Sequence, residues 1–198
     1  NNWELAPVFR QLFKSEHFFE DRFINAKVKS PYESFNNILR VGGMVMNEDY
    51  DSEMLEYIAY WTEQLGQRIF SPVDVAGWPG QRIWVNENTL TLRWSFMQEL
   101  LFSRLGNNDS ARAKLRQLAI DLTNLSKDPV VVTEALAQHF LNTTLDAGNL
   151  ETAVQYFKGE IPENYFVDGT WNLYFLEVPD QILNLLFYLT RLPEWQLG

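Results

Sequence analysis

The segment from Phe70 to Trp94 constrains the fold more than any other part of this 198-residue sequence. It contains three tryptophans, two glycines and two prolines. Proline fixes a backbone angle, glycine favours turns, and each indole ring needs a large surface to pack against. The segment therefore predicts a long loop, over Gly77–Asn86, that packs on the helix following it.

Composition excludes several classes of function. Apolar residues make up 46% of the chain, which is enough for a buried core. The net charge of −10 repels phosphate backbones, so we expect no nucleic-acid partner. The chain has no cysteine, which excludes disulfides and thiolate metal sites, and we expect no cofactor. Residues 1–4 show no feature of an export signal, so any such signal is expected to lie outside the given sequence.

Apolar residues at helical spacing predict helices along the chain, and runs typical of strands are short. The first helix is expected over residues 4–15, with Pro7 in its first turn. The sequence Ser30-Pro31-Tyr32-Glu33 is a capping box that begins the second helix, and the glycines at 42–43 end it.

Asp51 or Ser52 caps a third helix, which Gly66 ends. The following helix, Leu90–Leu105, carries apolar residues around much of its circumference, so we expect it to be the centre of the core. The run Ile182–Leu192 is too short and too mixed to cross a bilayer, and it predicts a core helix without a transmembrane segment.

Beyond Gly106, further helices are expected over residues 111–125, 129–145, 148–157 and from 179 onward, with an irregular connection at 159–169. The whole pattern predicts an all-α, irregular multi-helix bundle that forms a single domain over residues 1–198. The helix lengths also fit a paired-helix repeat, but no residue type recurs at a fixed period.

Three blocks of sequence stand in a fixed order within residues 7–105. They are Phe9-Arg10-x-Leu12-Phe13-x-Ser15-x-x-Phe18-Phe19, then Ala26-Lys27-Val28-Lys29-Ser30-Pro31-x-Glu33, and finally Pro72-x-Asp74-Val75-x-Gly77-Trp78-Pro79-Gly80 followed by Trp84-x-Asn86-x-x-Thr89-Leu90-x-x-Arg93-Trp94. In these blocks the chain resembles the bacterial family known as domain of unknown function 1800. The family usually has a second proline where this chain has Val73, which implies a less rigid loop.

The resemblance implies a large, helical, mostly exported bacterial protein, located in the periplasm or outside the cell. This chain would be a C-terminal piece of it, with residues 1–105 resembling the family and residues 106–198 forming additional helices. Members often lie in the genome beside a sulfatase-like family, which implies a task in the cell envelope and a protein partner there. The resemblance supplies no catalytic residue.

Five residues of the loop and the next helix are candidate ligand-binding residues: Trp78, Arg82, Trp84, Asn86 and Arg93. Aromatic faces beside amide and guanidinium groups suit the rings and hydroxyls of a carbohydrate. The alternative is that the tryptophans only hold the loop on the next helix. Exposure of these side chains would favour the carbohydrate hypothesis.

A metal site is not predicted. The run Asp49-Tyr50-Asp51-Ser52-Glu53 alternates carboxylates as calcium loops do, but it lacks the glycine of the sharp turn, and acids are expected where a helix begins. His17 and His139 each stand in apolar helical surroundings without a second ligand at metal spacing, so both are expected to be structural.

Motifs for nucleophilic, metalloprotease and phosphate-binding chemistry are missing from the sequence. We therefore expect a non-catalytic helical module of an exported cell-envelope protein that acts through protein contacts. Two alternatives stay open. The loop with Trp78 and Trp84 would bind carbohydrate, or the chain would support a hydrolase whose site lies in an N-terminal region outside the given sequence.

Overall fold

The computed structural model describes residues 3–78 and 80–198, so Pro79 of the predicted loop and the first two residues lie outside it. Within these ranges the chain forms helices and isolated bridges, with no strand, which confirms the predicted all-α multi-helix fold. The elements, in chain order, are α1 (Ala6–Phe13), η1 (Glu16–Phe19), η2 (Asp21–Phe23), α2 (Pro31–Val41), α3 (Ser52–Gln64), η3 (Gln81–Trp84), α4 (Glu87–Glu99), η4 (Leu100–Leu105), α5 (Asp109–Thr123), α6 (Pro129–Leu141), α7 (Ala147–Lys158), α8 (Glu163–Val167), α9 (Val178–Leu189) and η5 (Pro193–Gln196).

Capping side chains explain where several helices begin. The Ser30 hydroxyl accepts the N–H of Glu33 at 3.3 Å, and the Glu33 carboxylate accepts the N–H of Ser30 at 2.8 Å. The predicted capping box is therefore confirmed. Asp51 caps α3 by accepting the N–H of Met54 at 3.0 Å, and Asn86 caps α4 in the same way.

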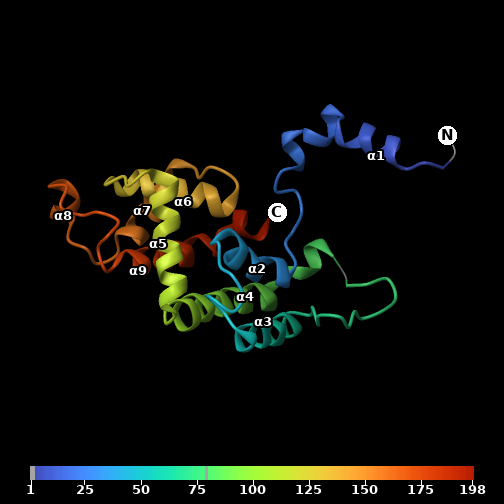
Figure 1. Cartoon of the computed structure of the whole chain (residues 1–198). Coiled ribbons are helices and arrows are strands. Elements are labelled where there is room, and N and C mark those ends of the chain that lie inside the picture. The colour runs from blue at the N-terminus through green and yellow to red at the C-terminus, as the bar shows by residue number, and fades with distance from the viewer. Residues whose placement is uncertain (1–2, 79) are drawn as a thin grey trace.

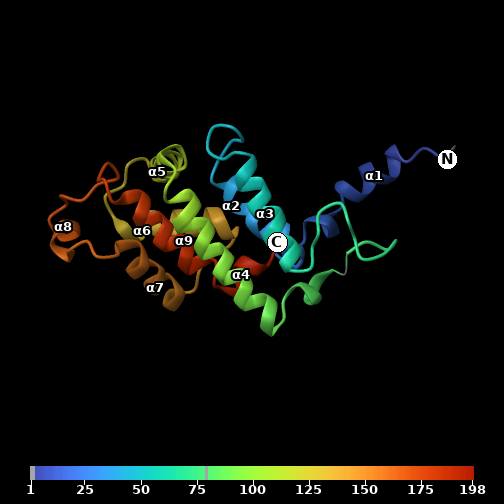
Figure 2. The ribbon, with the colours of Figure 1, turned by 90° about the horizontal axis from the view of Figure 1, so that it is seen from below.

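Helix α9 forms the centre of the core. Eight of its twelve residues are buried, and it packs against α5, α6, α7 and η4. Figure 2 shows α9 running alongside the green α4 helix, with α7 on its other side. The prediction of a core helix in this region is confirmed, and no helix within the described part of the chain is both long and apolar enough to span a bilayer.

The predicted central helix over Leu90–Leu105 divides into two parts. Its second part, η4, is a π-helical segment that buries Leu100, Leu101 and Leu105 against the core. Its first part, α4, buries only Arg93, Phe96 and Met97. Polar residues along α4 leave one side of it in solvent, whereas the leucines of η4 are fully buried, so the predicted helix contributes to the core mainly through its second part.

Two predictions of helix bounds were wrong. Residues 159–169 were expected to be irregular, but they contain the short helix α8. Helix α6 was expected to reach residue 145, but it ends at Leu141. The residue after it, Asn142, adopts a left-handed backbone with φ of 53°, a conformation that asparagine tolerates at the end of a helix.

Two segments project from the same end of the molecule. We call residues 3–24 the arm; they contain α1, η1 and η2, none of which has a buried residue. We call residues 66–78 the projecting loop; they leave the end of α3 and lead back to η3. Figures 1 and 2 both show the blue arm and the green loop extending away from the helices, at the end opposite α8.

The Gly/Pro-rich segment packs on the helices mainly through its final turn. Trp84, at the end of η3, is buried, whereas Phe70, Val73 and Val75 in the projecting loop are exposed. The large surface of the Trp84 indole anchors this turn, whereas the earlier apolar residues stay in solvent.

A matched pair of Leu→Ala variants tests this division between core and arm. Leu186 of α9 is fully buried, so Leu186→Ala is expected to lower the free energy of unfolding by about 2–5 kcal/mol. Leu12 of α1 is half exposed, so Leu12→Ala is expected to change it by less than about 0.5 kcal/mol. Urea unfolding measures both. A cost for Leu12→Ala close to that of Leu186→Ala would show that α1 packs on the core.

Candidate functional site

The five candidate ligand residues do not share one surface. Trp84 is 5% exposed and Arg93 is 2% exposed, so both side chains belong to the interior. Trp78 is half-buried, and Asn86 uses its side chain to cap α4. Arg82 is exposed and lies at an apolar groove.

Arg93 instead joins three segments of the chain. Its Nη1 donates to Oε1 of Gln196 at 3.0 Å, and its Nη2 donates to the carbonyl of Lys29 at 2.9 Å. Burial lowers the pKa of Arg93 to about 10. Residues 27–29 pair with residues 196–198 through backbone hydrogen bonds, including one from Lys29 N to Gln196 O at 2.7 Å. Arg93 therefore fastens this pairing to α4.

The same pairing is held to α2 by an indole. The Nε1 of Trp195 donates to the hydroxyl of Ser34 at 3.0 Å, and the ammonium of Lys29 donates to the carbonyl of Trp195 at 3.0 Å. Nearer the arm, Asn25 Nδ2 donates to the carbonyl of Leu141 at 3.2 Å. The chain is thus fixed from Asn25 onward, and the arm leads away from this fixed base.

The arm presents an apolar surface to solvent. Phe9 of α1 is 49% exposed and Phe19 of η1 is 68% exposed. Ten large apolar residues of the arm are exposed: Trp3, Leu5, Val8, Phe9, Leu12, Phe13, Phe18, Phe19, Phe23 and Ile24. Helices as short as the eight-residue α1 have little stability by themselves, and exposed apolar patches commonly mark interaction sites. The arm is the clearest candidate functional surface of the chain.

The aromatic rings of the arm contact mainly one another. The ring centroids of Phe13 and Phe18 are 5.1 Å apart, and those of Phe18 and Phe19 are 5.2 Å apart. His17 lies with its Nδ1 at 2.6 Å from the Glu20 carboxylate, while its ring contacts Phe23. These contacts give the arm a defined shape without covering its apolar surface.

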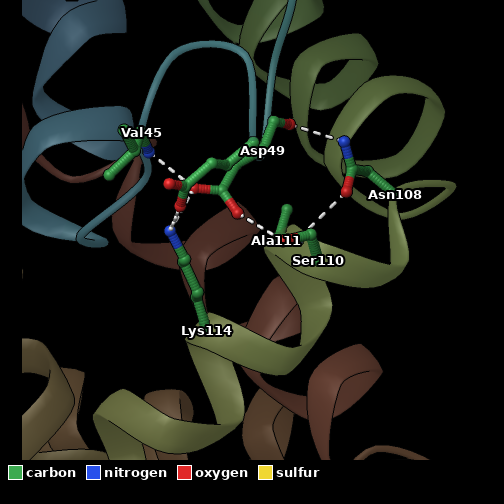
Figure 3. Close-up of polar contacts among 7 residues, drawn as sticks. Val45, Asp49, Asn108, Ser110, Ala111 and Lys114 are labelled. Carbon is green, nitrogen blue, oxygen red and sulfur yellow. Dashed lines mark hydrogen bonds and ion pairs between the residues drawn. The ribbon is translucent and has the colours of Figure 1, made fainter.

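Asp49 is a fully buried carboxylate that links the segment between α2 and α3 to the start of α5 (Figure 3). It accepts hydrogen bonds from Val45 N at 2.5 Å, from the Ser110 hydroxyl at 2.7 Å and from the Lys114 ammonium at 2.6 Å. The carbonyl of Asp49 accepts from Asn108, whose other amide atom caps α5. All of these contacts are structural.

These hydrogen bonds also fix the charge of Asp49. Burial acts to raise its pKa, but the hydrogen bonds from Lys114, Ser110 and Val45 N outweigh burial and hold the pKa below its ordinary value. Asp49 is therefore ionised and paired. The described residues contain no group of three or more metal-binding side chains, and Asp51 is occupied as the cap of α3.

Sequence reasoning did not identify this role for Asp49. Its partner Lys114 lies 65 positions further along the chain, so no local pattern connects them. His139, predicted to be structural, lies with its Nε2 3.0 Å from the carbonyl of Val41 at the end of α2. The acidic run is thus explained by a helix cap and by the ion pair of the buried Asp49 with Lys114.

Replacing Asp49 with asparagine tests its structural role. Asp49→Asn removes a buried charge from its partners, so we expect a loss of about 2–4 kcal/mol in the free energy of unfolding at neutral pH. Because the pKa of Asp49 is lowered, its contribution exists above the ordinary carboxyl pKa and disappears as the pH falls through the lowered value. Asp49→Asn should therefore flatten the acid side of the stability profile.

The matched control for this variant is Asp51→Asn. Asparagine caps helices as well as aspartate, so the control should change stability by less than about 0.5 kcal/mol. Urea unfolding over a pH series measures both variants. Equal effects of Asp49→Asn and Asp51→Asn would contradict the role assigned to the buried ion pair.

Comparison with known families covers almost the whole chain. A family model described as "Protein of unknown function (DUF1800)" matches residues 1–197. This match takes in residues 106–197, which lie beyond the three blocks that carry the resemblance. No curated protein and no solved structure shows a significant match to the chain. The match over residues 1–197 shows that the chain belongs to the DUF1800 family.

Proposed function

We propose that this chain is a non-catalytic helical module of an exported bacterial cell-envelope protein, and that it binds a protein partner through the arm. The observation that carries the proposal is the exposed apolar surface of residues 3–24, on helices that contain no buried residue. The export and the envelope location rest on the family resemblance.

The chemistry of α1 fits a protein groove. Val8, Phe9, Leu12 and Phe13 recur at the spacing of one helical face, as in helices that lie in a hydrophobic groove of a partner. Burial of one such side chain contributes roughly 1.5–3 kcal/mol, so a few of them offset the cost of ordering a short helix. The partner surface therefore needs an apolar groove of about two helical turns.

The buried charged residues support a structural module. Asp49 is held by hydrogen bonds from three partners, and both terminal nitrogens of Arg93 donate to acceptors within the fold. Apart from the local bond from Val45 N, each of these contacts joins segments that are distant in the chain. These contacts stabilise the fold, and the arm is the surface that is left for contacts with a protein partner.

Photo-crosslinking in the native bacterium tests this proposal. The photoreactive residue p-benzoylphenylalanine replaces Phe9 in the full-length protein, and the matched control places it at Tyr174, an aromatic residue that is 67% exposed between α8 and α9. We expect one discrete protein adduct from position 9 and none of the same mass from position 174. Mass spectrometry identifies the adduct.

Two results would overturn the proposal. The first is the absence of a protein adduct at position 9, or the same adducts from both positions. The second is recovery of the protein from the cytoplasmic fraction, which contradicts export. A glycan that quenches tryptophan fluorescence at saturation would favour carbohydrate binding over a protein partner.

A further inference from the structure

A polar cleft lies beside the fixed base of the arm. Its volume is about 410 Å³, and its charged and amide lining comes from Lys27, Lys29, Glu33, Asn36, Asn37 and Arg40. It adjoins a second cleft of about 360 Å³ that shares Lys29 and Asn37 and is also lined by His139. The clefts thus lie between α2, the end of α6 and residues 27–29.

The charge of this cleft is opposite to that of the whole chain. Three cationic side chains and one carboxylate line it, in a protein of net charge −10. Glu33 is already paired with Lys27. Arg40 is exposed and takes part in none of the ion pairs formed between described residues. A guanidinium is therefore available at the edge of a locally positive cleft.

Lys29 lies in the cleft without a carboxylate of its own. Its ammonium donates to the carbonyl of Trp195 at 3.0 Å and lies 5.2 Å from the centre of that ring. Burial lowers the pKa of Lys29 to about 8, against a smaller opposing effect of Glu33. An anion in the cleft would favour the charged form of this ammonium.

The other charged groups around Lys29 come from each neighbouring element. Lys27 precedes it in the same segment, and Glu33 and Arg40 belong to α2. His139 lines the adjoining cleft from α6, and Arg93 of α4 donates to the Lys29 carbonyl. Glu33 is the only carboxylate side chain among these groups, and Gly198, whose backbone oxygen accepts from Lys27 N, lines both clefts beside Lys29.

We propose that this cleft binds a small organic anion, whose single carboxylate or phosphate group is held by Arg40 and Lys29. A guanidinium offers two parallel N–H donors to either group, and the ammonium adds a further charged donor. Asn36 and Asn37 supply amide donors and acceptors for hydroxyl groups of the same ligand. This site is separate from the apolar arm and does not depend on the protein partner.

Isothermal titration of the chain with glucuronate and with inorganic phosphate, at low ionic strength, tests this site. Arg40→Gln is expected to weaken binding about tenfold or more, because it removes the free bidentate donor. The matched control Arg68→Gln removes another exposed arginine, outside the cleft, and should leave the affinity unchanged within about twofold. The tighter of the two probes shows whether carboxylate or phosphate is preferred.

A pH series with glucuronate tests the part assigned to Lys29. The carboxylate of the probe stays ionised, so its affinity for the wild-type chain should fall as the pH rises through about 8. Lys29→Met should bind more weakly and lose this pH dependence. If Lys29→Met does not fold, as judged by circular dichroism, the pH dependence of the wild-type affinity tests Lys29, and Arg40→Gln tests the site.

Three results would overturn the proposal. These are the absence of saturable binding by either probe, equal losses in Arg40→Gln and Arg68→Gln, and an affinity of the wild-type chain that does not change as the pH rises through about 8.

Discussion

The buried guanidinium of Arg93 is the contact on which the arrangement of the arm depends. It donates to Gln196 and to the carbonyl of Lys29, and so fastens the pairing of residues 27–29 with residues 196–198 to α4. Removing a guanidinium from water is costly unless its donors find acceptors, and here two acceptors come from segments that the contact must hold together. These hydrogen bonds hold the base of the arm against α4, while the arm itself is exposed.

The same contact also shapes the polar cleft. Lys27 and Lys29 line the cleft. The backbone pairing of residues 27–29 with residues 196–198 sets their position. The capping box at Ser30 then starts α2 directly after this pairing, which brings Arg40 to the other edge of the cleft. One buried arginine therefore positions both proposed surfaces, one apolar and one cationic.

Local signals in the sequence predicted most of the fold. The capping box at Ser30, the cap at Asp51 and the apolar run after Ile182 each act within a few residues, so their effects can be read from the chain. The contacts of Asp49 and Arg93 could not be predicted, because their partners lie 65 and 103 positions away. Tryptophan and arginine suit both a sugar-binding site and a protein interior. Only the burial of Trp84 and Arg93 in the structure places them in the interior.

The arm shows a similar limit. Its apolar spacing predicts a helix correctly, but periodicity does not tell whether another part of the chain covers the apolar face. The structure also shows where the three sequence blocks that resemble the family lie. The first lies in the arm, the second contains the base of the arm and part of the cleft, and the third runs from the projecting loop to Trp94 in α4.

Amide hydrogen exchange of the isolated chain tests the central claim most directly, because exchange reports how strongly each segment is held. The account predicts that amides of α1 exchange with little protection, while those of α9 and the paired amide of Lys29 are strongly protected. Protection of α1 equal to that of α9 would contradict the account, since the arm would then be part of the folded core and not a free contact surface.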